Sequence, residues 1–158
     1  MISEAVRKHG GIIVEVSKNN MQEAVKEGIE KVYHFLNDAQ TYYLATVDGT
    51  KPRVRPFGTI LLQDGKLYIQ TGKVKEVSRQ ISENPFVEIC AFMNGAWLRV
   101  SAELVEDDSH DVKVAMLEKM PALKGMYSAD DNNMQMFYLK DATATFSSFT
   151  AEPEVITF

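Results

Sequence analysis

Apolar residues recur with helical spacing between residues 22 and 37. Val25, Ile29, Val32 and Leu36 follow one another at steps of four, three and four residues. This spacing aligns the four side chains along one side of an α-helix, which predicts an amphipathic helix over 22–37.

After this helix the pattern changes to short β-prone runs separated by Asp-Gly and Asn-Gly pairs, which are typical hairpin turns. The predicted strands span 42–47, 52–62, 66–71, 86–93, 96–105, 134–139 and 142–149. Helices are predicted over 73–83 and from Asp107 or Asp108 to Pro121. Strands linked mainly by hairpins predict a mainly β fold with flanking helices, an antiparallel barrel.

The length of 158 residues favours one domain with a sizeable core. Residues 1–20 are interpreted as an N-terminal extension, and residues 21–158 as the single domain. The opening segment has only a short apolar patch and no small-residue cleavage pattern, so no signal peptide is predicted. No apolar run approaches the roughly 20 residues that span a bilayer, so we expect no membrane partner.

Basic residues concentrate in one stretch of an otherwise acidic chain. Residues 51–79 contain seven Lys or Arg and two Asp or Glu, a local charge of +5, whereas the whole chain carries −5. Arg53 and Arg55, and likewise Lys73 and Lys75, are two positions apart, so each pair points to one side of an extended strand. This arrangement favours a small dianion such as a phosphate monoester. A charge of +5 is too small for a nucleic-acid surface, which we therefore exclude.

Other reactive residue types are sparse. The single Cys90 lies in an apolar strand and is expected to be inert core, and three separated histidines offer no metal site. A chain without a disulfide is expected in a reducing cytoplasm. No combination of side chains predicts a catalytic acid, base or nucleophile, so the catalytic residues stay unassigned. The methionines between 116 and 136 are interpreted mainly as core filling.

Four segments carry a resemblance to a known family: YLATVDGTKPRVRPFG, LYIQTGKVKEVSRQISENPFVEICAF, GAWLRVSAEL and FYLKDATATFSSFTAEPEVITF. They resemble the split-barrel flavoproteins of the pyridoxamine 5′-phosphate oxidase-like superfamily, and within it the small bacterial proteins grouped with nitroimidazole-resistance proteins. The resemblance implies an FMN-binding antiparallel split β-barrel. It also implies a homodimer that holds FMN at the subunit interface.

The resemblance assigns cofactor-binding roles to ten positions. They are Arg53, Val54, Arg55, Pro56, Phe57, Gln70, Thr71, Lys73, Lys75 and Trp97. Lys75 is the candidate phosphate lysine, and it and the amides of residues 72–74 are expected near a helix start, where free amides favour an anion. Without the resemblance, Arg55, Thr71 and Lys75 would be interpreted as solvent-exposed polar groups. Trp97 is equally compatible with a core or dimer contact and with a flavin contact.

The C-terminal segment TAEPEVITF departs from the family pattern. Pyridoxamine phosphate oxidases have an arginine–histidine motif there that binds the substrate phosphate, and this segment has neither residue. The resemblance therefore implies an FMN-dependent oxidoreductase acting on a small substrate, nitroaromatic or pyridoxamine-like, without assigning the oxidase activity itself. The alternatives are a non-catalytic module that binds flavin, haem or deazaflavin, and an empty split barrel that only dimerises.

Overall fold

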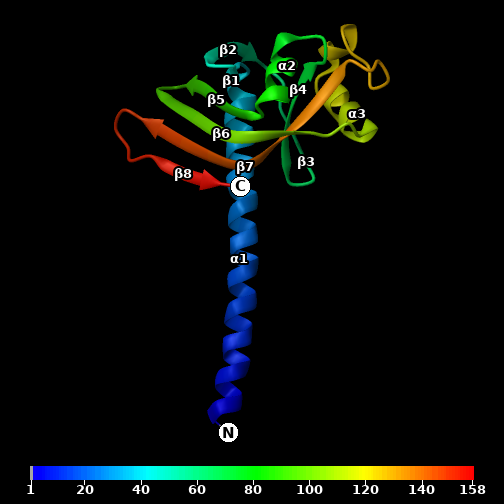
Figure 1. Cartoon of the computed structure of the whole chain (residues 1–158). Helices are drawn as coiled ribbons and strands as arrows, with labels where there is room; N and C mark the ends of the chain where they lie inside the picture. The colour runs from blue at the N-terminus through cyan, green and yellow to red at the C-terminus, as the bar shows by residue number, and fades with distance from the viewer. Residues whose placement is uncertain (1) are drawn as a thin grey trace.

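The computed structural model describes residues 2–158, with side chains from residue 18 onward. The strands in this part of the chain are β1 (Tyr42–Asp48), β2 (Lys51–Phe57), β3 (Leu61–Gln63), β4 (Lys66–Gly72), β5 (Phe86–Met93), β6 (Ala96–Glu106), β7 (Met134–Ser148) and β8 (Glu154–Thr157). They form one antiparallel sheet in the order β2-β1-β5-β6-β7-β4-β3, and β8 pairs with β7 (Figure 1). The sheet curls into a barrel that stays open between β2 and β3, which confirms the predicted split barrel.

Two predicted strand boundaries were wrong. The expected strand 52–62 is divided into β2 and β3, which lie at opposite edges of the sheet. Gly58 lies in the break, where an added Cβ would be 3.2 Å from the backbone oxygen of Gln40, and Tyr42 donates a hydrogen bond to the carbonyl of Thr59. The chain therefore leaves one edge and crosses to the other.

The second boundary lies at Asp141, where 134–139 and 142–149 were expected to be separate strands. They are the two halves of the 15-residue β7. A β-bulge opposite Ser101–Glu103 and a positive φ of 50° at Asp141 bend the strand without ending it. The bend lets the first half of β7 pair with β4 and the second half with β8.

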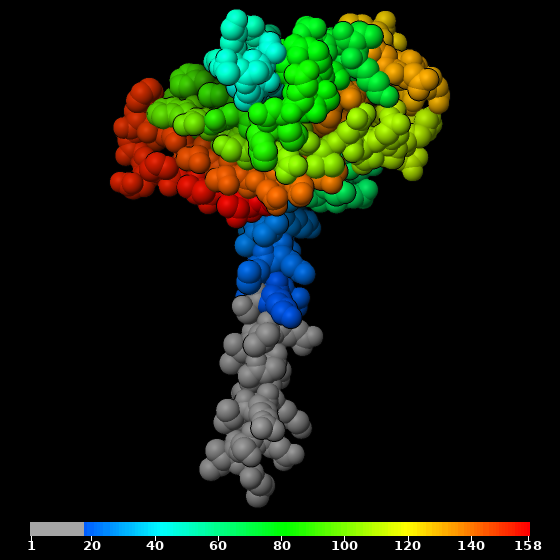
Figure 2. All heavy atoms as spheres, in the orientation of Figure 1, coloured from blue at the N-terminus to red at the C-terminus, as the bar shows by residue number. Residues whose placement is uncertain are grey.

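The helices are α1 (Ile2–Ala39), α2 (Glu76–Glu83), α3 (His110–Lys119) and the short 3₁₀ helix η1 (Pro121–Gly125). Helix α1 contains the predicted helix 22–37 and extends beyond it; the expectation of a separate segment 1–20 falls largely outside the described side chains. Its residues Ile29, Val32 and Leu36 are buried under the sheet, while Val25 is 43% exposed. In Figure 2 the blue part of α1 leaves the body of the domain, which explains why its apolar stripe is covered only toward its C-terminal end. No helix among the described residues is both long enough and apolar enough to cross a membrane.

The core has two parts. The larger one lies between α1 and the inner face of the sheet and contains Leu44, Ile69 and Leu98. The smaller one lies under α3 and η1 and contains Met116, Met134, Met136 and Tyr127. These three methionines are fully buried, which confirms their core role, whereas Met126 is 71% exposed.

The outer face of the sheet carries exposed apolar side chains. Strand β5 alternates, with Val87, Ile89 and Ala91 buried toward the core and Phe86, Cys90 and Phe92 exposed on the outer face. Cys90 is one of the outward residues and is exposed, so the prediction of an inert core cysteine was wrong. Most residues around Cys90 are apolar, so the sequence did not reveal that the side chains of this strand alternate between the core and the outer face. Tyr43 lies directly beside Cys90 on β1 and is 51% exposed.

Candidate functional site

A cavity of about 170 Å³ lies where the end of β2, the end of β4 and the start of α2 meet the η1 region. Five of the ten predicted site residues line it: Pro56, Phe57, Gln70, Thr71 and Lys75. Arg53, Val54, Arg55, Lys73 and Trp97 are not among its lining residues. The structure therefore brings together residues from β2 and β4 as the sequence pattern indicated.

Thr71 is the most informative residue of the cavity. It is 3% exposed, and its Oγ1 has no hydrogen-bond partner among the described residues. The polar groups next to Thr71 have hydrogen-bond partners within the chain. The Gln70 side-chain nitrogen donates to the Thr71 carbonyl at 2.8 Å, and Thr59 Oγ1 accepts from the Gln70 backbone N–H at 2.9 Å. Buried hydroxyls are nearly always hydrogen-bonded, so an unpartnered one that lines a cavity indicates a place for a ligand atom.

Tyr127 closes the cavity on the side of the smaller core. A Cβ at Gly72 would lie 3.0 Å from the Tyr127 hydroxyl and 3.2 Å from Asn133 Nδ2, so only glycine lets the phenol approach β4 this closely. The ring is buried, and the residue lines the same cavity as Thr71. The phenol is therefore a second hydroxyl available at this end of β4.

The turn between β4 and α2 is held by the loop before β7. The amides of Lys73 and Val74 donate to the backbone oxygen and to Oδ1 of Asn133, at 2.8 and 3.2 Å. The prediction that these amides are free to bind an anion was therefore wrong, and so was the helix start at 73, because both residues belong to the turn.

The open donors at this turn belong to the next residues. The amides of Glu76 and Val77 precede the first intrahelical bonds of α2 and have no acceptor among the described residues. Lys75 is exposed at the helix N-cap and forms no ion pair within the described part of the chain. Its ammonium therefore remains available to an anion in the cavity.

Arg55 lies behind the cavity, between β1, β2 and α2. Its guanidinium donates to Thr46 Oγ1 at 2.7 Å, to Gln80 Oε1 at 2.6 Å and to the carbonyl of Leu44 at 3.2 Å. All three acceptors are neutral, and burial together with the charge of Arg53 lowers the pKa of Arg55 below its usual range. Among the described side chains, this partly buried cation has no carboxylate partner.

Arg53 shares the face of Arg55, as expected from a regular two-residue spacing, but it is neutralised. Its Nε donates to Asp48 at 3.3 Å, and Arg79 binds the same carboxylate at 3.2 Å. These two arginines, Arg79 first, lower the pKa of Asp48. The positive charge that remains available in residues 51–79 therefore belongs mainly to Arg55 and the lysines.

The remaining predicted residues face elsewhere. Lys73 is exposed. The pKa of Asp108 is lowered mainly by Lys113 and to a smaller extent by Lys73. Val54 is 68% exposed on the outer face of β2. Trp97 lies at the start of β6, and its ring centroid is 5.2 Å from that of Phe149. Within one chain these three residues do not reach the cavity.

The sequence interpretation missed five lining residues: Gly58, Thr59, Leu123, Met126 and Tyr127. Gly58 and Thr59 lie in the break between β2 and β3, and the other three follow α3, more than forty residues beyond the basic stretch 51–79. Met126 was predicted to fill the core and is instead exposed beside the cavity, whereas no local signal pointed to Leu123 or Tyr127.

Comparison with known proteins gives three kinds of result. The family model described as pyridoxamine 5′-phosphate oxidase matches residues 29–154. A NimC/NimA family protein from Clostridium acetobutylicum is 36% identical, with 88% of this chain and 98% of that chain covered and a TM-score of 0.83. Comparison with curated proteins gives no match.

More distant structures share the fold alone. A pyridoxamine 5′-phosphate oxidase-related, FMN-binding protein from Nostoc punctiforme is 18% identical, covers 82% of this chain and 94% of its own, and has a TM-score of 0.56. A heme binding protein from Mycobacterium smegmatis is 14% identical, covers 77% and 57%, and has a TM-score of 0.61. The fold, the family model and the NimC/NimA relative agree with the resemblance found in the sequence, and the chain belongs to the pyridoxamine 5′-phosphate oxidase-like split-barrel family, in its NimC/NimA group.

Proposed function

We propose that this protein is an FMN-binding flavoprotein and an oxidoreductase that works as a homodimer. The observation that carries the proposal is the buried, unpartnered hydroxyl of Thr71 in a cavity that Lys75 also lines. The FMN-binding fold neighbour supports the choice of cofactor.

The donor set suits a phosphate monoester. Thr71 and Tyr127 offer hydroxyl groups, Lys75 offers an ammonium, and Glu76 and Val77 offer the first amides of α2. Hydroxyls, ammonium groups and helix-start amides are the usual ligands of a phosphate dianion. Arg55 adds positive charge behind the site without a competing carboxylate. The residues present therefore fit the phosphate end of FMN.

The cavity is too small for the whole cofactor. Its volume of about 170 Å³ is below the roughly 300–1,000 Å³ of typical small-molecule sites. We propose that a second copy supplies the missing wall. Val54 and Trp97, which this chain directs away from its own cavity, are then placed to contact a flavin that both copies share.

The outer face of the sheet is the proposed contact between copies. Tyr43, Val54, Phe86 and Phe92 are between 51% and 68% exposed there. Tyr43 lies beside Cys90, and Phe92 lies beside Trp97 across the β5–β6 ladder. Connected exposed aromatic side chains of this kind are characteristic of protein interfaces.

The chain's own residues bind and position, whereas bound FMN would supply hydride or electron transfer. Lys75 and Thr71 would fix the phosphate, and Leu123 and Met126 add apolar surface to the cavity wall. A small planar substrate, nitroaromatic or pyridoxamine-like, is the proposed reaction partner.

Haem is the second candidate, because one fold neighbour is a heme binding protein. Haem iron is usually held by His or Cys, and neither residue type lines the described cavity. His110 pairs with Asp130, and neither it nor His34 lines the cavity. FMN fits this donor set better.

The absorption spectrum of the purified protein tests the proposal, followed by release and chromatography of the chromophore. We expect a two-band flavin spectrum with released FMN, bleached by a nicotinamide donor and restored by a nitroaromatic acceptor. A Soret band would support haem instead. A flavin that is never reduced would indicate a binding module, and a protein that ignores added FMN would contradict the proposal.

A further inference from the structure

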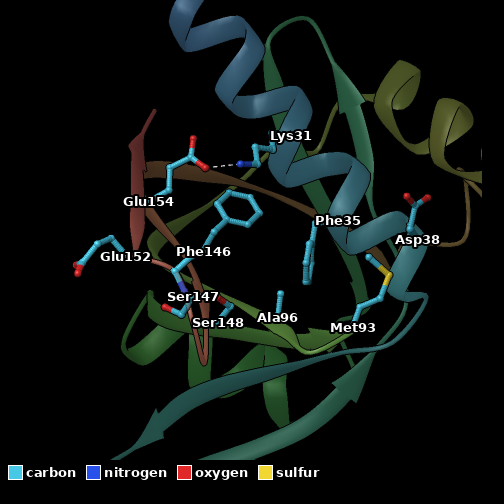
Figure 3. A pocket seen from close by; sticks show the side chains of 11 residues that line it. Lys31, Phe35, Asp38, Met93, Ala96, Phe146, Ser147, Ser148, Glu152 and Glu154 are labelled. Atoms are coloured by element: carbon cyan, nitrogen blue, oxygen red, sulfur yellow. Dashed lines mark hydrogen bonds and ion pairs between the residues drawn. The ribbon is translucent and has the colours of Figure 1, made fainter.

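A second cavity lies between α1 and the C-terminal part of the sheet, and it shares no lining residue with the candidate flavin site (Figure 3). Its volume is about 430 Å³, within the roughly 300–1,000 Å³ typical of small-molecule sites. Its walls come from α1, the β5–β6 turn and the segment that joins β7 to β8. It is therefore formed by elements other than those that build the flavin cavity.

Two phenyl rings form the interior of this second cavity. Phe35 of α1 and Phe146 of β7 meet edge to face, with ring centroids 5.7 Å apart and planes at 75°. Met93 and Ala96 extend the apolar surface at the β5–β6 turn. The rings are only partly buried, so they offer aromatic surface to a ligand body.

A cation already sits on this aromatic surface. The ammonium of Lys31 lies 4.5 Å from the centroid of the Phe146 ring and forms an ion pair with Glu154 of β8. Both side chains are about half exposed, at 49% and 55%. A ring face combined with a carboxylate is a favourable environment for an ammonium group.

Negative charge predominates around the cavity. Glu154, Asp38 and Glu152 contribute three carboxylates and Lys31 one ammonium, so the lining carries a net charge of −2. Figure 3 shows Glu152 and Asp38 at opposite ends of the cavity, with the two phenyl rings between them. The charge complements a cationic ligand with an apolar body.

From these contacts we propose that the cavity binds a small arylalkyl ammonium ion. Its amine takes the position of the Lys31 ammonium, between the Phe146 ring and Glu154, and its aromatic body lies against Phe35. Lys31 then acts as an intramolecular competitor. Its displacement costs little, because a half-exposed ion pair contributes weakly to stability. The proposal does not depend on the flavin site.

Benzylamine is a suitable probe, titrated at pH 7 into the full-length protein and followed by calorimetry and by amide chemical shifts. Benzyl alcohol and benzoate have the same ring with no charge and with a negative charge. We expect saturable binding of benzylammonium, at least tenfold weaker binding of the alcohol and none of benzoate, with shifts concentrated around Phe35 and Phe146. Equal binding of the amine and the alcohol would overturn the proposal.

Three variants test the assigned position, because removing the competitor and removing a binding group should change the affinity for benzylammonium in opposite directions. Lys31→Met removes the competitor and is expected to tighten benzylammonium binding about tenfold, whereas Glu154→Gln and Phe146→Leu are expected to weaken it about tenfold. Lys140→Met is the matched control, because Lys140 forms a comparable exposed pair with Glu103 on another part of the sheet. Weaker binding by Lys31→Met, or unchanged binding by the folded Glu154→Gln protein, would contradict the assigned position.

Discussion

Arg55 Nη2 donates a 2.6 Å hydrogen bond to Gln80 Oε1, and this contact joins the edge strand β2 to helix α2. The same amide oxygen accepts from Thr46 Oγ1. One buried glutamine thus holds the guanidinium of Arg55 and connects it to α2.

Gln80→Met keeps the length of the side chain but removes this acceptor. Arg55 and Thr46 would then keep buried donors without a partner, so we expect the free energy of unfolding to fall by about 1–3 kcal/mol. Urea denaturation measures the loss. The exposed Gln22→Met is the control and is expected to stay within about 0.5 kcal/mol. A loss no larger than that of the control would show that the contact is energetically unimportant.

Gly72 and Tyr127 form a testable steric pair. Gly72→Ala places a methyl group 3.0 Å from the phenol oxygen, so we expect a destabilisation of about 1–3 kcal/mol from overpacking. Tyr127→Leu removes the phenol, and the double variant should recover part of the Gly72→Ala cost. Gly125→Ala has open space around it and is the control. Strict additivity in this double-mutant cycle would mean that the two side chains do not compete for space.

Asp131 gives the loop before β7 a dependence on pH. Its carboxylate accepts from the amides of Met134, Ser128 and Asn133, each at 2.8 Å, and these bonds lower its pKa. A lowered folded-state pKa stabilises the fold above the unfolded value of about 3.9 and loses that effect as pH falls through the folded value.

Asp131→Asn should therefore lower the melting temperature at pH 7 and leave a smaller deficit near pH 3. Thermal unfolding across this range checks the trend, with the exposed Asp130→Asn as the neighbouring control. The loop also carries Asn133, which holds the turn at Lys73, so the variant is expected to weaken FMN binding at pH 7. A deficit that does not shrink on acidification would argue against the carboxylate.

The proposed dimer predicts a specific loss of assembly. Phe92→Asp places a charge in the middle of the exposed outer face and is expected to yield monomers in sedimentation velocity. Cys90 on the same face should then react faster with a thiol reagent. Met21→Lys, an exposed position on α1, should remain dimeric. If the α1 variant dissociates and the sheet variant does not, the contact belongs to the helix.

The hairpins could be predicted because their turns are encoded locally. Asp64-Gly65 and Asn94-Gly95 take positive φ at both positions, as the dipeptides indicated. The continuity of β7 could not be predicted, since Lys140-Asp141 looks the same in a turn and in a bulge. Which one forms is decided by pairing with β6, far away in the sequence.

The candidate site shows the same limit. That Thr71 and Lys75 line one cavity could be predicted, because they lie four residues apart in a charged stretch with a family resemblance. Tyr127 could not, because only the packing of η1 against β4 brings its hydroxyl to the cavity. Asn133 accepts hydrogen bonds from the amides that were expected to be free. This could not be predicted either, because the loop of Asn133 meets the turn only in the folded chain.

The most direct test of the flavin site compares FMN with riboflavin, which lacks only the phosphate. Flavin-free protein is titrated with each by quenching of flavin fluorescence, and the measurement is repeated with Thr71→Val and Lys75→Gln; Lys51→Gln on β2 is the control lysine. The account predicts that FMN binds much more tightly than riboflavin. Each site variant should lower FMN affinity roughly 10- to 100-fold, the worth of one hydrogen bond to a charged group, and leave riboflavin affinity unchanged. Equal affinity for FMN and riboflavin in the unmodified protein would contradict the proposed phosphate site.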